Sequence, residues 1–123
     1  MSDCSGSVKH YTQVPAQAFG PEAPGTAIRV LLNDEQDGAP VYTMRMIEIQ
    51  PGGHSPLHRH PYEHENYVLE GEGEVEIDGQ IYALTAGTVV LVPADVQHQY
   101  RNTGSALLRF LCSIPVEKFR KLV

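Results

Sequence analysis

The chain has 123 residues, of which 41% are hydrophobic, and its net charge is −6 at pH 7. A length of this order predicts one domain with one core, and the acidic balance argues against nucleic acid or an anionic membrane surface as a partner. Neither an apolar run of about 18 residues nor a secretion signal is found, so we expect no membrane span and a cytoplasmic location.

The N-terminal quarter of the chain contains few regular patterns. Residues 1–8 are predicted to be flexible, and a single folded domain is expected over residues 9–123. Residues 9–14 are predicted to be extended. Residues 15–25 contain three prolines and two glycines, which predicts an irregular loop.

The rest of the chain alternates short apolar segments with turn residues. Residues 33–40 are predicted to form a polar turn, and Asp78-Gly79 favours a two-residue hairpin because both of its central positions need positive φ. Many short strands at regular spacing indicate an antiparallel sandwich or barrel. The predicted strands cover residues 27–32, 41–49, 66–69, 74–77, 80–84, 88–92, 96–101 and 106–114.

The C-terminal tail, residues 116–123, is predicted to form a short helix. It follows Pro115, and proline suits the first turn of a helix. Val116, Phe119 and Val123 would share one face of this helix. A helix of this length is not stable alone, so we expect it to pack either on the same barrel or on a partner subunit.

Four of the six histidines lie between Gly52 and Glu65. His58 and His60 are two residues apart, so they point to one face of a strand, and His64 shares their parity if the chain stays extended. Neutral imidazole is a versatile ligand for divalent first-row metals. Three buried imidazoles are hard to explain as core filling, because each needs a partner for its polar nitrogens. The stretch therefore predicts a metal site.

Two spaced motifs resemble those of the cupin superfamily. The first is Gly52, His58-Arg59-His60, Glu63-His64-Glu65 and Gly71, and the second is Gly87, Pro93-Ala94-Asp95, His98 and Asn102. The segments at residues 60–65 and 110–115 further resemble a small subgroup of single-domain, four-histidine, manganese-type cupins. The resemblance implies an all-β fold, a small antiparallel β-barrel of the jelly-roll type, in which the motif histidines point inward and bind one divalent metal ion.

The third ligand departs from the family pattern, which usually has a glutamate there. This chain has His64 at that position, flanked by Glu63 and Glu65. Strand parity favours His64, because both glutamates would face away from the other histidines; Glu65 is the alternative. The expected metal ligands are His58, His60, His64 and His98. Manganese or iron is favoured by the resemblance, and nickel, copper, cobalt and zinc are alternatives because imidazole accepts most of these metals.

Four imidazoles leave the charge of a divalent metal uncompensated by the protein. A tetrahedral arrangement would be a closed, structural zinc site, whereas an octahedral one would leave two positions open. A barrel interior favours the open site, because its mouth is a ligand pocket. An anionic or enolate-like small-molecule substrate would then supply the missing negative charge, with the metal acting as a Lewis acid and template.

Several further residues have two interpretations each. Cys112 is either a buried small apolar residue or, as the subgroup resemblance implies, lines the cavity near the metal with Phe110. Arg45 is interpreted as a rim residue, with a cation that anchors an acidic substrate as the alternative. His54 is expected in a solvated loop, with a pocket position as the alternative, and Asn102 is expected to fix the turn after the last motif histidine.

The only cysteines, Cys4 and Cys112, lie far apart in the sequence. Cys4 falls in the tail that is predicted to be flexible. We therefore expect no disulfide between them, as is usual in a reducing compartment.

The leading functional hypothesis is a metal-dependent, oxygenase-type enzyme that acts on a small organic substrate with manganese or iron. The sequence shows no separate acid and base pair, so the metal would carry the chemistry. The alternatives are a metal-dependent isomerase or lyase, and a non-catalytic module that binds a small molecule or metal. A homodimer is expected from the family resemblance alone.

Overall fold

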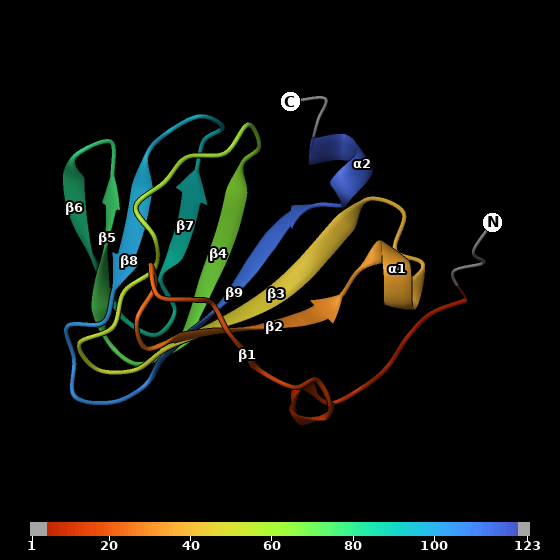
Figure 1. The fold of residues 1–123 in the computed structure, drawn as a ribbon, viewed down its shortest axis with the longest axis horizontal. Helices are drawn as coiled ribbons and strands as arrows, with labels where there is room; N and C mark the ends of the chain where they lie inside the picture. The colour runs from red at the N-terminus through yellow and green to blue at the C-terminus, as the bar shows by residue number, and fades with distance from the viewer. Residues whose placement is uncertain (1–4, 121–123) are drawn as a thin grey trace.

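The computed structural model describes residues 5–120, which form two antiparallel sheets and a few short helices (Figure 1). The larger sheet has six strands in the order β1-β2-β3-β9-β4-β7, and the smaller has three in the order β6-β5-β8. The predicted all-β, antiparallel class is confirmed, and so is a short C-terminal helix.

Every strand predicted between residues 27 and 114 is present, with ends that shift by at most two residues. The strands of the large sheet are β1 (Gln17–Ala18), β2 (Thr26–Leu32), β3 (Tyr42–Ile49), β4 (His64–Glu70), β7 (Val89–Val92) and β9 (Leu108–Pro115). The strands of the small sheet are β5 (Gly73–Ile77), β6 (Gln80–Leu84) and β8 (His98–Arg101). The hairpin between β5 and β6 has the predicted geometry, since φ is 50° at Asp78 and 79° at Gly79.

The extended segment predicted at residues 9–14 is wrong. The chain there forms a 3-10 helix, η1 (Tyr11–Gln13), because two side chains satisfy the amides that a helix start leaves free. The imidazole of His10 accepts from the amide of Thr12, and the side chain of Gln13 accepts from the amide of His10. This local capping box favours a helical turn over a strand.

Two other N-terminal predictions were incomplete. The loop at residues 15–25 contains the short strand β1, which pairs with β2. The polar turn at residues 33–40 contains one helical turn, α1 (Asp34–Asp37). Asn33 caps its start and Gly38 ends it in the left-handed conformation, as asparagine and glycine commonly do.

The described part of the C-terminal helix is α2 (Glu117–Arg120), and the rest of the predicted helix, residues 121–123, lies outside the described residues. Pro115 pairs with Tyr42 as the last residue of β9 instead of opening the helix. The amide of Val116 donates to the carbonyl of Val41, and the Val116 side chain is buried against the chain's own barrel. No helix within the described residues is long and apolar enough to cross a membrane. The homodimer stays a prediction.

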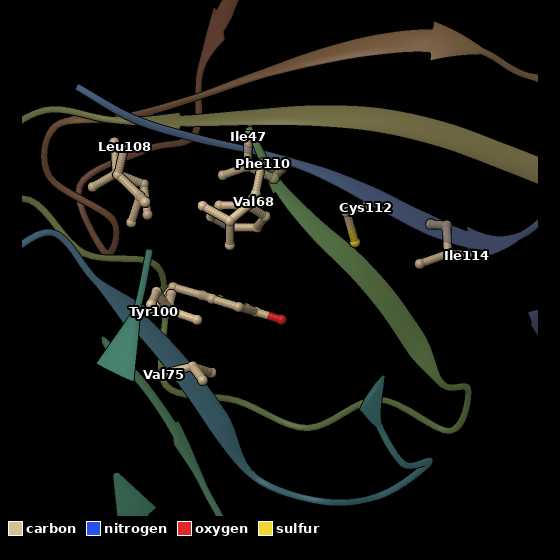
Figure 2. Close-up of a cluster of buried hydrophobic side chains, with 10 residues drawn as sticks. Ile47, Val68, Val75, Tyr100, Leu108, Phe110, Cys112 and Ile114 are labelled. Atoms are coloured by element: carbon tan, nitrogen blue, oxygen red, sulfur yellow. The ribbon is translucent and has the colours of Figure 1, made fainter. Parts of the chain in front are cut away.

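The hydrophobic core lies between the two sheets (Figure 2). Tyr100 from β8 in the small sheet stacks on Phe110 from β9 in the large sheet, with ring centroids 4.6 Å apart. The other buried members of the cluster are Ile47, Ile49, Val68, Val75, Leu84, Leu108, Cys112 and Ile114. Burial of large apolar side chains from both sheets holds the sheets together.

The inner face of the large sheet changes from apolar to polar along its central strands. Residues that face each other across β3, β9 and β4 form cross-strand rows, because side chains alternate between the two faces of a strand. One row is Ile47, Phe110 and Val68, and the next row along is Arg45, Cys112 and Asn66. The polar row lies at the end of the barrel where the histidines lie.

Asn102 fixes the turn after β8, as expected. Its amide nitrogen donates to the carbonyls of Ile49 (2.7 Å) and Ala106 (2.8 Å), and its side-chain oxygen accepts from the amide of Gly104 (2.9 Å). The side chain is buried, so removing it leaves these backbone groups without partners.

We expect Asn102→Ala to lower the free energy of unfolding by about 2–4 kcal/mol, because several buried hydrogen-bonding groups lose their partner together. Urea unfolding of the two proteins measures the difference. Thr103→Ala, in the same turn but exposed, is the matched control and should change it little. Equal midpoints for the two variants would contradict the role of Asn102.

Candidate metal centre

The four predicted histidines meet at one end of the barrel. His58 and His60 lie in the segment between β3 and β4, His64 opens β4, and His98 opens β8. An isolated β-bridge joins the two sequence motifs: the His58 amide donates to the His98 carbonyl (3.2 Å), and the His98 amide donates to the His58 carbonyl (2.9 Å). The Asp95 amide donates to the His60 carbonyl (2.6 Å), and Asp95 itself has a φ of 64°.

Three of the imidazoles are arranged so that one cation could contact them all. A ring nitrogen from each of His58, His60 and His98 lies within 4.8 Å of the other two. The fourth, His64, falls outside that set, although its ring stacks on His60 with centroids 4.4 Å apart and lies 5.0 Å from the His98 ring. The structure therefore shows a three-histidine site with His64 beside it.

The nitrogens of this cluster fit a divalent cation. The Nε2 atoms of His60, His64 and His98 are buried, and none has a hydrogen-bond partner within residues 5–120. The Nδ1 atom of His98 lies 2.9 Å from the carbonyl oxygen of Val96. Because a carbonyl only accepts, Nδ1 carries the proton and the lone pair of Nε2 is free to bind a metal.

The flanking glutamates are on the outside of the barrel. Glu63 and Glu65 are both exposed and line a separate groove on the outer surface, whereas His64 between them is 5% exposed. This placement follows from the alternation of side chains along β4. Glu65 does not reach the histidine cluster, as the parity argument indicated.

The histidines surround a cavity of about 180 Å³ between the sheets. Its described lining contains no aspartate or glutamate. Besides the four histidines, it consists of Phe19, Thr26, Arg45, Ile47, Ser55, Pro56, Tyr62, Tyr100, Phe110 and Cys112.

Arg45, Phe110 and Cys112 all line this cavity. Arg45 is half-buried, its Nε is enclosed and its Nη2 lies 3.0 Å from the Cys112 sulfur, so its interpretation as a rim residue stays a prediction. Figure 2 shows that sulfur directed from β9 into the space between the sheets. Cys112 is a free thiol, and Cys4 lies outside the described residues.

His54 does not line the cavity. Its Nδ1 lies 2.9 Å from the carbonyl oxygen of Ser55 and 3.3 Å from the side-chain amide of Gln99. It therefore holds the loop against β8, which agrees with the expected loop position.

Sequence reasoning missed Tyr100, which lines the cavity, and Asn66, which bonds to Tyr100. The Tyr100 hydroxyl donates to the side-chain oxygen of Asn66, whose amide nitrogen donates to the Leu111 carbonyl (3.3 Å). A signal was available, because each follows a motif histidine by two residues on a strand and so faces the same side.

The cupin domain family matches residues 45–114, more than half of the chain. The chain belongs to the cupin domain family. The structure of the polyketide cyclase RemF from Streptomyces resistomycificus is similar to this cupin with a TM-score of 0.82 and 31% sequence identity, over 91% of this chain and 80% of RemF.

Curated relatives of this cupin carry different names. The polyketide synthase CurC from Streptomyces cyaneus is 35% identical over 88 residues, which cover 71% of this chain and 57% of CurC. A 5-nitrosalicylic acid 1,2-dioxygenase from Bradyrhizobium is 34% identical over 56 residues, 46% of this chain and 27% of that protein. This cupin thus spans little more than half the length of CurC.

The electrostatics of the cavity keep its imidazoles neutral. Burial lowers the pKa of His58, His60, His64 and His98, and the positive charge of Arg45 lowers each of them further. The pKa of His60 falls to about 4. Neutral imidazoles are the form that binds a metal.

These shifts predict that the metal-free cupin loses stability in mild acid. Below a pH of about 6.5 the unfolded chain binds protons at these histidines while the folded chain does not, so stability falls as the pH drops from 7 toward 4. Above pH 6.5 these histidines are neutral in both the folded and the unfolded chain, so this loss of stability is absent. Urea midpoints of the metal-free protein at pH 7.5 and pH 5 measure it, and His60→Asn should make the midpoint less dependent on pH. A higher midpoint at pH 5 would contradict the burial of neutral imidazoles.

Proposed function

We propose that this cupin is a metal-dependent enzyme that enolises a small carbonyl substrate. His58, His60 and His98 would hold one divalent cation, with His64 as the fourth ligand. The observation that carries the proposal is a cavity lined by neutral imidazoles and one guanidinium without any carboxylate in its described lining. Such a surface stabilises negative charge that develops on a bound substrate.

His64 is proposed as the fourth ligand because one of its ring nitrogens has no hydrogen-bond partner within residues 5–120. Its Nε2 is buried and has no partner in the described part of the chain, while Nδ1 lies 3.5 Å from the Cys112 sulfur. Leaving a buried polar nitrogen unpaired is unfavourable, and a shared cation would satisfy it together with its neighbours. Manganese or iron is proposed for this ligand set from the subgroup resemblance.

A divalent cation bound there would act as a Lewis acid that polarises a carbonyl oxygen of the substrate. The protein's own side chains would prepare the site for that chemistry. The Val96 carbonyl fixes the ring of His98. Ile47 and Phe110 supply an apolar wall that excludes water.

Tyr100 would hold a proton at the cavity wall. Burial raises the pKa of its phenol far above the ordinary value, so the hydroxyl stays protonated. Its hydrogen bond to Asn66 fixes the ring position. A neutral phenol is a hydrogen-bond donor and does not add negative charge to the cavity.

The names of two relatives support a carbonyl substrate. RemF is a polyketide cyclase and CurC a polyketide synthase, and ring closure of a polyketide forms a carbon–carbon bond through an enolate. The cavity, at about 180 Å³, is smaller than the ~300–1,000 Å³ of common ligand sites. We therefore propose that it receives a small molecule or one carbonyl unit of a longer chain.

A second candidate is the oxygenase function expected from the sequence. It is favoured by the relative named as a dioxygenase and by the redox metals proposed for the site. The two candidates differ in their need for dioxygen, which makes them separable by one experiment.

That experiment measures deuterium exchange from solvent into the methylene of acetoacetate by NMR, with metal-loaded protein, in the presence and absence of dioxygen. Enolisation predicts exchange faster than with the His98→Ala variant and independent of dioxygen. Dioxygen uptake in proportion to acetoacetate lost would favour the oxygenase. Tight binding of unchanged, unexchanged acetoacetate would indicate a non-catalytic module and overturn the proposal.

A further inference from the structure

Arg45 stands apart from the other arginines on strands. Arg29, Arg101 and Arg109 each form an ion pair with a glutamate, at 3.2, 3.0 and 2.7 Å. Within residues 5–120, Arg45 has no carboxylate partner, and its Nε is buried without any hydrogen bond. Its only hydrogen-bond contact in the described chain is the sulfur of Cys112, at 3.0 Å.

A thiol does not satisfy a guanidinium. The guanidinium presents five N–H donors in a planar fork, and one sulfur is a weak acceptor for one of them. Burying a charge without a counter-charge is unfavourable. Arg45 is half-buried with its Nε enclosed, and within residues 5–120 it lacks the stabilising ion pair that such an arginine usually forms.

The position of Arg45 directs it to the cavity. It faces Cys112 across β3 and β9, in the row next to the apolar row of Ile47 and Phe110. It lines the same cavity as the four histidines. A divalent cation at neutral imidazoles would add to this positive charge, and the described lining offers no carboxylate to balance it.

We infer that Arg45 binds a carboxylate of the substrate, so that the substrate is an acidic carbonyl compound such as a small β-keto acid. The inference rests on the proposed function and names the substrate class for that site. Arginine suits this role because its fork matches the two oxygens of a carboxylate. The enolisable carbonyl meets the metal site and the carboxylate meets Arg45, which makes Arg45 a specificity-determining residue.

The volume of the cavity is consistent with this class. At about 180 Å³, it has room for roughly six water molecules at liquid density. A β-keto acid of the size of acetoacetate fits such a space.

The test compares acetoacetate with acetylacetone, which has the same skeleton but a methyl group in place of a carboxylate oxygen. Each is titrated into cobalt-loaded protein, and the visible absorption of the cobalt reports binding. For Arg45→Gln we expect acetoacetate to bind about 10- to 100-fold more weakly, the usual loss when a hydrogen-bonded charge partner is removed. Acetylacetone should change by less than about threefold, because it makes no ionic contact with the guanidinium.

Two further variants complete the design. Arg101→Gln removes an arginine that pairs with Glu74 away from the cavity, so it should leave both affinities unchanged. Arg45→Lys keeps the charge but loses the planar fork, so acetoacetate should bind with intermediate affinity. If Arg45→Gln does not fold, the lysine variant carries the comparison.

The outcomes separate this inference from the proposed function. Equal weakening of both probes by Arg45→Gln, or no weakening of acetoacetate, would overturn the role of Arg45. Failure of the wild-type protein to bind acetoacetate would also overturn it. Selective loss of acetoacetate binding in Arg45→Gln, together with no deuterium exchange in the wild type, would support the inference and reject enolisation.

Discussion

Replacing His98 by alanine is expected to remove the bound metal outright. His98 is 2% exposed, and its Nδ1 proton is committed to the Val96 carbonyl, so Nε2 is a fixed lone pair among the other imidazoles. Loss of one of three or four ligands also leaves a coordination position of the metal to water instead of the protein. Metal per chain, measured by mass spectrometry on protein purified without added metal, should fall from about one to near zero.

The matched control for this experiment is His54→Ala. His54 is also a histidine of the first motif region, but it lies outside the cavity lining and bonds to Ser55 and Gln99. The His54→Ala variant should keep its metal. His58→Ala should lose it, as His98→Ala does. Full occupancy in either cavity variant would reject the assignment of these residues as ligands.

Gly71→Ala is expected to destabilise the fold by about 2–6 kcal/mol, the sum of left-handed backbone strain and a steric overlap. Gly71 has a φ of 89°, and a Cβ there would overlap the Leu107 carbonyl oxygen and lie 2.7 Å from the Cα of Leu108. Both neighbours are backbone and do not move aside at low cost. Urea unfolding gives the difference in free energy.

Gly79→Ala is the comparison that isolates the steric part. Gly79 has a similar φ of 79°, but no atom of residues 5–120 would lie within 4 Å of a Cβ there. It should lose only about 1–2 kcal/mol, the cost of a left-handed conformation for a residue with a side chain. If both variants lose the same amount, the close approach at Gly71 does not restrict that position.

The sequence was most informative where one face of a strand is buried and the other is not. Along β4, His64 is buried and Glu65 is exposed, so parity alone separated the histidine from the glutamates. The hairpin at Asp78-Gly79 was predicted because its chemistry is local and requires two positive φ angles. The same holds for Asn102, whose partners are mostly in its own turn.

Strand parity does not identify which side of β3 faces the cavity, for a physical reason. This strand lies inside the large sheet. Four successive residues, Met46 to Ile49, are buried, so side chains on both faces of the strand are covered there. Alternation then separates Arg45 from Met44 without saying which of them faces the cavity. Glu48 is buried on the opposite face because Arg29 and Arg109 pair with it there, a contact between distant segments that sequence spacing does not reveal.

The histidine cluster could be predicted as a set but not in its geometry. Motif spacing identified the four residues, and the bridge between His58 and His98 brings the two motifs together. The stacking of His64 on His60 depends on the packing of side chains around them. The capped turns η1 and α1 were missed because one or two side-chain hydrogen bonds decide them.

The most direct measurement is anomalous diffraction at a metal absorption edge from crystals of the metal-loaded protein. We predict one anomalous peak per chain, about 2.0–2.3 Å from ring nitrogens of the cavity histidines, with His58, His60 and His98 among the ligands. A peak bound by Glu63 or Glu65 on the outer surface, or no peak at the histidines in protein that carries metal, would contradict it.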